Sequence, residues 1–161
     1  MRSPAQEANH DPGPSRCHDG TQLYASQPAV AGRIQDKQQP FASTLPSGEY
    51  FVPDIAVIPA ALAGPTRGGG REIDAYAEPL PLIVEVWSPS TGDYDVSTKL
   101  PGYKSRGDLE IWILHPYRVE VTVWRLQTNG SYTEHHYGAA DTVEVLSLQG
   151  VRIRLASVCP A

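Results

Sequence analysis

Three side chains that could act together on a charged substrate stand in well-defined sequence contexts. Glu85 lies within residues 82–87, a run that is apolar on both faces and predicts a strand buried inside a sheet. An ionised carboxylate at such a position is strongly destabilising unless a cation or a hydrogen-bond donor compensates it. Asp54 lies in a second apolar run, residues 52–58, and Lys99 lies in the polar segment after the Glu85 strand.

Two carboxylates on buried strands and one lysine are the components of a metal-dependent phosphodiesterase site. Each residue also has a structural explanation. Asp54 follows Pro53 and, taken alone, is more typical of a turn or bulge acid than of a ligand. Glu85 and Lys99 could form a structural ion pair that binds nothing. Asp95 is more typical of an acid that favours a helix start than of a catalytic group.

The composition limits the classes of protein that the chain can form. Its 161 residues, 40% of them hydrophobic, are enough for one hydrophobic core. The formal net charge of −5 argues against an extensive basic surface, although a small cleft can be positive on an acidic protein. No apolar run reaches the length of a membrane span, and no signal-peptide core follows Met1. Cys17 and Cys159 lack metal-site spacing and are expected to be reduced thiols of a cytoplasmic protein.

Residues 1–48 differ in composition from the rest of the chain. They contain six prolines, several amides and charges that sum to zero, without sustained periodicity. This pattern predicts a flexible or divergent N-terminal segment with at most a short helix or strand near residues 21–30. Residues 49–161 are then expected to form the folded domain.

The remaining sequence predicts a mixed β-sheet with few helices, an α+β fold. The Asn129-Gly130 pair predicts a hairpin that returns over residues 131–137. Residues 60–79 are expected to form a loop. Strands are expected at residues 50–59 with an interruption at Pro53, at 82–87, 109–114 and 118–126, and as short segments at 143–146 and 151–155.

Residues 93–107 have the only marked helical character. Lys99 and Tyr103 stand four residues apart, which places them on one face of a helix, and Gly107 can close it. Pro101-Gly102 disfavours an unbroken helix by roughly 3 kcal/mol, so a broken or two-piece helix is expected.

Two other motifs are less informative. His135 and His136 are neighbours on a predicted strand and point to opposite faces, so they do not share one metal ion. Gly68-Gly69-Gly70 lacks the ending of a phosphate loop and predicts a flexible hairpin tip, beside which Arg67 and Arg71 could contact a nucleic-acid backbone.

Several segments between about residues 49 and 137 combine into a specific pattern. They are Pro53-Asp54-Ile55-Ala56-Val57, Leu82-Ile83-Val84-Glu85-Val86-Trp87-Ser88-Pro89-Ser90-Thr91, Asp95-Val96-Ser97-Thr98-Lys99 and Ile111-Trp112-Ile113-Leu114-His115-Pro116, with Tyr103 and Gly107. This pattern resembles the Uma2 family (DUF820), restriction-endonuclease-like proteins of the PD-(D/E)XK nuclease superfamily.

The resemblance implies a sheet flanked by helices and a catalytic set of Asp54, Glu85 and Lys99. Asp54 and Glu85 would bind Mg²⁺ or Mn²⁺ together with the Val86 carbonyl, since Mg²⁺ prefers oxygen ligands and usually keeps several waters. Trp87 occupies the lysine position of the strand motif, and Lys99 on the following helix would replace it. Lys99 could orient or deprotonate the attacking water, or pair with the phosphate.

The resulting interpretation is a metal-dependent endonuclease that hydrolyses phosphodiester bonds of DNA, with a homodimer implied by analogy with the fold. The alternative is a catalytically inactive Uma2-like binding or interaction module, truncated relative to the family. Residues 1–48 lack the opening helix and hairpin of family members, and His115 stands where an aspartate is usual, which favours the alternative. A weaker third interpretation is an enzyme that handles a phosphoryl group on a small molecule.

Overall fold

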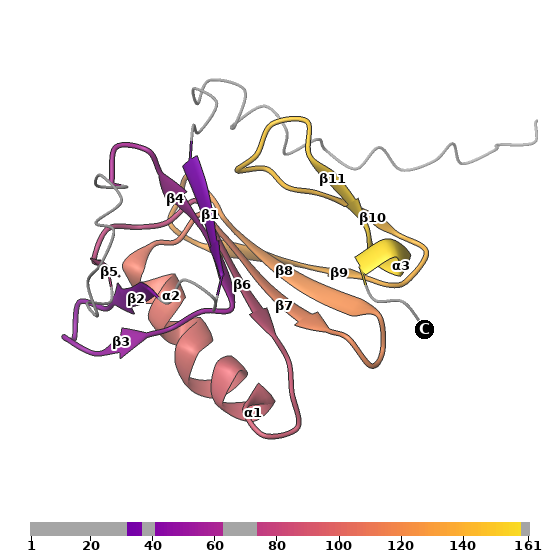
Figure 1. Cartoon of the computed structure of the whole chain (residues 1–161), viewed down its shortest axis with the longest axis horizontal. Helices are drawn as coiled ribbons and strands as arrows, with labels where there is room; N and C mark the ends of the chain where they lie inside the picture. Colours follow the sequence, from indigo (N-terminus) through magenta and orange to yellow (C-terminus); the bar gives the residue numbers. More distant parts are fainter. Residues whose placement is uncertain (1–31, 37–40, 63–73, 159–161) are drawn as a thin grey trace, which may run out of the picture.

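A six-stranded mixed sheet forms the centre of the protein (Figure 1). The structure, a computed structural model, describes residues 32–36, 41–62 and 74–158. In spatial order the strands of the sheet are β1 (Gly32–Asp36), β4 (Ile55–Pro59), β6 (Leu82–Val86), β7 (Glu110–His115), β8 (Glu120–Leu126) and β9 (Tyr132–Tyr137). The predicted α+β fold with a mixed sheet is confirmed.

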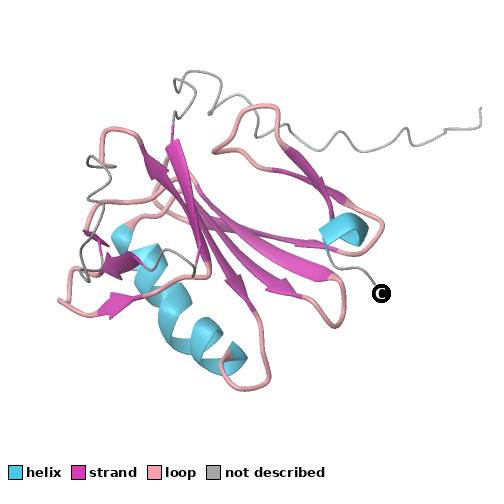
Figure 2. Ribbon diagram, in the orientation of Figure 1, coloured by secondary structure: helices cyan, strands magenta, loops and turns pink. Residues whose placement is uncertain are grey.

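The two central strands, β6 and β7, run parallel, whereas the other neighbours in this sheet are antiparallel. A parallel pair needs a connection that crosses one face of the sheet, and a helix makes that crossing here. The helix consists of α1 (Gly92–Tyr94), the π-helical turn η2 (Asp95–Lys99) and α2 (Leu100–Arg106), and it lies on one face of the sheet (Figure 2).

The sequence predicted a broken or two-piece helix. The structure has one continuous helical run over residues 92–106, in which the α-helical pattern is interrupted by the π turn η2. Pro101 is the second residue of α2, directly after the π turn. The π turn ends directly before α2, so Pro101, which has no N–H to donate, stands where the helical hydrogen-bond pattern changes from π back to α. Gly107 ends the helix in the left-handed conformation, with φ of 88°, as predicted.

Smaller elements cover both faces of the central sheet (Figure 1). A three-stranded sheet, in the order β3 (Tyr50–Phe51), β2 (Phe41–Thr44) and β5 (Asp74–Tyr76), lies beside the helix. The hairpin of β10 (Thr142–Glu144) and β11 (Arg152–Arg154) precedes the short α3 (Leu155–Val158). Their buried apolar residues join two core clusters, one that contains residues of the helix and one that contains residues of β10 and α3.

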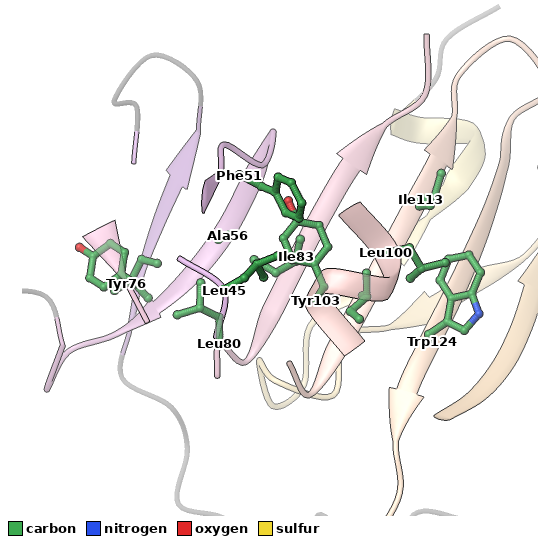
Figure 3. Close-up of a cluster of buried hydrophobic side chains, with 12 residues drawn as sticks. Leu45, Phe51, Ala56, Tyr76, Leu80, Ile83, Leu100, Tyr103, Ile113 and Trp124 are labelled. Atoms are coloured by element: carbon green, nitrogen blue, oxygen red, sulfur yellow. The ribbon is translucent and has the colours of Figure 1, made fainter. Parts of the chain in front are cut away.

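The cluster on the helix side fixes the helix against the sheet. Figure 3 shows Leu100 and Tyr103 of α2 among Phe51, Ile83 and Trp124, which come from three different strands. All five side chains are buried. This packing holds the helical face that carries Lys99 and Tyr103 toward β6.

Two strands lie where the sequence predicted none. β1 pairs with β4 in antiparallel register, and β2 pairs with β3 and β5, so residues 32–36 contribute to the central sheet and residues 41–44 to the three-stranded sheet. These strands have four or five residues among amides and prolines, a length too short for alternation to stand out. β5 inside the predicted loop at 60–79 and α3 at the end of the predicted strand 151–155 were missed for the same reason.

The strand predictions at 82–87, 109–114 and 118–126 and the hairpin at Asn129-Gly130 are confirmed. The strand predicted over 50–59 breaks at Pro53 into β3 and β4. No helix in the described residues has the length and apolar character needed to cross a membrane. The cysteines, residues 21–30 and the Gly68-Gly69-Gly70 motif with its arginines lie outside the described residues.

Candidate active site

Glu85 is the buried centre of the candidate site. It lies one residue before the end of β6 and is 1% exposed. Its Oε1 accepts hydrogen bonds from Tyr103 Oη at 2.6 Å and from Lys99 Nζ at 3.0 Å. Its Oε2 is also buried and has no hydrogen-bond partner within the described part of the chain. The strand therefore presents one satisfied and one unsatisfied carboxylate oxygen.

The helix supplies both donors to Glu85 because Lys99 and Tyr103 stand four residues apart on one face. Lys99 Nζ also lies 2.9 Å from Asp95 Oδ1, so the ammonium group bridges two buried carboxylates. From the sequence, Asp95 is expected to be an acid that favours the helix start. Its spacing of four from Lys99 was the available signal that the two side chains interact.

Burial dominates the electrostatics of Glu85 and raises its pKa to about 7. The hydrogen bond from Tyr103 and the charge of Lys99 lower this pKa but do not offset burial. Burial alone would lower the pKa of Lys99, yet the charges of Glu85 and Asp95 raise it above its ordinary value. The pKa of Tyr103 is raised by burial and by the neighbouring Glu85. Lys99 and Tyr103 therefore keep their protons at neutral pH.

Asp54 lies beside Glu85 at the end of the β4–β6 ladder. The register pairs Ile55 with Val84, and its continuation by one residue places Asp54 opposite Glu85. Asp54 Oδ2 accepts a hydrogen bond of 2.7 Å from the Val86 N–H. Because the N–H and C=O of one strand residue project toward the same neighbouring strand, the Val86 carbonyl also faces the side of Asp54.

The oxygens gathered here fit a hydrated divalent cation better than a closed metal cage. Within residues 32–36, 41–62 and 74–158, no group of three or more His, Cys, Asp or Glu side chains is arranged to hold a metal ion. Asp54, the unpartnered Oε2 of Glu85 and the Val86 carbonyl offer a smaller oxygen set. Mg²⁺ usually binds one or two carboxylates and keeps several waters, so this set is sufficient.

Other polar residues singled out from the sequence lie away from this arrangement or have local roles. His135 and His136 are exposed on β9, where His136 Nδ1 and Thr122 Oγ1 lie 3.1 Å apart. Ser88 Oγ lies within hydrogen-bond distance of the hydroxyls of Ser90 and Thr91, in the turn before α1. These hydroxyls satisfy one another, as expected for a turn.

The fold can be compared with known protein structures. The structure resembles the crystal structure of a putative nuclease belonging to DUF820 from Anabaena variabilis ATCC 29413, with a TM-score of 0.62. The two chains are 17% identical over 81% of this chain and 69% of the other, which demonstrates a common fold.

The family follows from the sequence itself. The model of the Uma2 family, described as putative restriction endonuclease, matches residues 22–156. The chain therefore belongs to the Uma2 family, as its motifs indicated. No curated protein matches the chain.

Proposed function

We propose that this protein is a metal-dependent endonuclease that hydrolyses phosphodiester bonds of DNA at Asp54, Glu85 and Lys99. The observation that carries the proposal is the unpartnered Oε2 of Glu85, a buried carboxylate oxygen at a strand end beside Asp54. Buried polar atoms without a partner are rare because they are destabilising, and a functional ligand is a common explanation for them. Membership in a family described as putative restriction endonuclease supports the same activity.

In the proposed mechanism, Asp54, Glu85 and the Val86 carbonyl would hold Mg²⁺ or Mn²⁺. When bound, the cation would neutralise charge that develops on the phosphate and lower the pKa of a water ligand. Lys99 stays protonated because two carboxylates face it, so it acts as a cation that pairs with the phosphate or orients the water. This charge state argues against the alternative in which Lys99 deprotonates the water. Tyr103 fixes the orientation of Glu85 through its hydrogen bond.

A second function, that of a catalytically inactive binding module, is favoured by a different observation. Lys99 already neutralises Glu85 and Asp95, which is what a purely structural ion network would do. The absence of a three-residue metal group among the described residues points the same way. The two functions differ in whether the oxygens of Asp54 and Glu85 bind a cation.

Calorimetric titration with Mn²⁺ and a plasmid-nicking assay separate the two. We expect the wild-type protein to bind Mn²⁺ and to nick DNA in its presence, and we expect Glu85→Gln and Asp54→Asn to lose both properties. Glu120→Gln, which changes an exposed carboxylate on β8, is the matched control and should retain them. Absence of Mn²⁺ binding by the wild-type protein would favour the inactive module. Cleavage by Glu85→Gln at the wild-type rate would remove Glu85 from the mechanism.

The homodimer implied by analogy with the fold stays a prediction, which sedimentation equilibrium would check.

A further inference from the structure

Three aromatic rings meet directly beyond the candidate site. Trp87 follows Glu85 by two residues, which places it one step further along the same face. Its indole stacks on His115, with ring centroids 4.3 Å apart and 12° between the planes. Tyr117 lies nearly perpendicular to both rings, with centroid distances of 6.2 Å to Trp87 and 6.0 Å to His115. We call Trp87, His115 and Tyr117 the aromatic step.

The inner two rings of the aromatic step are closely packed and partly buried, and the outer ring is exposed. A methyl group on Gly92 would overlap the Trp87 indole, so the start of α1 packs closely against this ring. His115 is half-buried on the other side, at the end of β7. Tyr117 rests against both rings and is nevertheless 72% exposed. An exposed ring that packs against other rings is an arrangement on which proteins stack nucleobases.

The charges around the aromatic step favour stacking over contacts with many phosphates. Lys99 and Arg118 are the only basic residues in the described segments 82–99 and 110–120, which contain the site and the aromatic step. Lys99 is already engaged by two carboxylates. Three other cations of the described residues have partners elsewhere: Lys104 lies over Trp124 and Tyr132, Arg106 pairs with Asp108, and Arg125 pairs with Glu110.

Duplex binding depends on neutralising several phosphates with lysine and arginine, and the described segments 82–99 and 110–120 offer only Lys99 and Arg118 for this purpose. Stacking on an aromatic ring is available only to a base whose face is free, as in a single strand, an unpaired end or a loop. The combination of an exposed ring and few cations therefore favours an unpaired strand over a duplex as the bound nucleic acid.

We propose that the site acts on unpaired nucleic-acid strands and that a base next to the scissile phosphate stacks on Tyr117. The inference rests on the proposed phosphodiesterase function and specifies the form of its substrate. Trp87 and His115 hold Tyr117 in place, and the base covers the exposed part of the Tyr117 ring. Because every base has an aromatic face, this contact would tolerate different sequences.

Binding can be measured without chemistry by fluorescence anisotropy of labelled oligonucleotides in EDTA. We expect the wild-type protein to bind a single strand more tightly than the duplex of the same sequence. Tyr117→Ala should weaken single-strand binding by about five- to a hundredfold, the range for loss of one base stack. Tyr117→Phe keeps the ring and should bind as the wild type does. Tyr50→Ala, which removes a tyrosine that is 65% exposed on β3, is the matched control and should change nothing.

The outcomes separate this inference from the proposed function. Single-strand binding that depends on Tyr117, without metal-dependent cleavage, supports the base contact at Tyr117 and rejects the nuclease. Cleavage of duplex DNA with equal kcat/KM in the wild type and Tyr117→Ala supports the nuclease and overturns the inference. Tighter binding of duplex than of single strand, or no binding of either, also overturns it.

Discussion

The burial of the Glu85 carboxylate leads to a specific prediction about the free energy of unfolding. In Glu85→Gln the amide keeps the shape of the side chain and removes the ionisation. Lys99 loses one carboxylate partner but retains Asp95, 2.9 Å away. If Glu85 is retained for chemistry and not for folding, the variant should become the more stable protein wherever the wild-type carboxylate is ionised.

The magnitude follows from the pKa of Glu85, which folding raises from 4.5 to about 7. Each pKa unit corresponds to about 1.4 kcal/mol, so the shift represents about 3 kcal/mol of disfavoured ionisation in the folded state. Between these two pKa values the unfolded chain binds fewer protons than the folded chain, so wild-type stability falls as pH rises. The stability of the protein with Glu85 protonated, relative to the ionised form, is fully present below pH 4.5 and is lost as pH rises through about 7.

Urea unfolding of both proteins across this pH range is the assay. The free energy of unfolding of Glu85→Gln relative to wild type should increase by about 3 kcal/mol from below pH 4.5 to above pH 7. Glu120→Gln, at an exposed position, should follow the wild-type curve. The reasoning would be refuted if the difference in free energy of unfolding between Glu85→Gln and wild type stayed constant with pH, or if the variant became relatively less stable as pH rose. Either result would identify Glu85 as a stabilising partner of Lys99.

Three further substitutions test the surroundings of the site. Tyr103→Phe removes a hydrogen bond that lowers the pKa of Glu85, so calorimetry should show that Mn²⁺ binding begins at a higher pH, by about one unit. Arg106→Met leaves a buried carboxylate unpaired and should lower the free energy of unfolding in urea by about 3–5 kcal/mol. Gly92→Ala forces the indole of Trp87 to move, so it should cost about 1–3 kcal/mol in the same assay and change the tryptophan fluorescence.

Each of these variants has a matched control. Tyr132→Phe removes a tyrosine hydroxyl that donates to a backbone carbonyl and should leave the pH dependence of Mn²⁺ binding unchanged. Arg118→Met changes an exposed arginine, and Gly138→Ala adds a methyl group with ordinary contacts. If a test variant behaves like its control, the contact assigned to it does not have the proposed effect.

The part of the site that the sequence predicted correctly depends on local patterns. Glu85 stood out because it interrupts a run that is apolar on both faces, and β6 is buried on both faces. Lys99 and Tyr103 were placed on one helical face by their spacing, and both reach Glu85. Such patterns are visible because the physical cause, burial or helical periodicity, acts within a few residues.

The part that could not be predicted depends on partners far away in the sequence. β1 and β2 are strands because β4, β3 and β5 provide their hydrogen bonds, and nothing within residues 32–44 reveals those partners. The aromatic step joins Trp87 to His115 and Tyr117, about thirty residues later, through the parallel pairing of β6 with β7. Only the topology of the sheet brings these rings together.

Pro101, the residue least favourable to a helix in this segment, lies next to the π turn that carries Asp95 and Lys99. In the π turn η2 the Leu100 N–H bonds to the Asp95 carbonyl, five residues earlier, and α-helical bonding resumes beside a proline that has no N–H to donate. Because proline has no N–H, a helix loses fewest backbone hydrogen bonds when it changes its hydrogen-bond register there. π turns are also frequent at functional sites. Asp95 and Lys99 are the first and last residues of this turn. The irregularity that argued against a helix is therefore part of what places a charged ammonium group between two buried carboxylates.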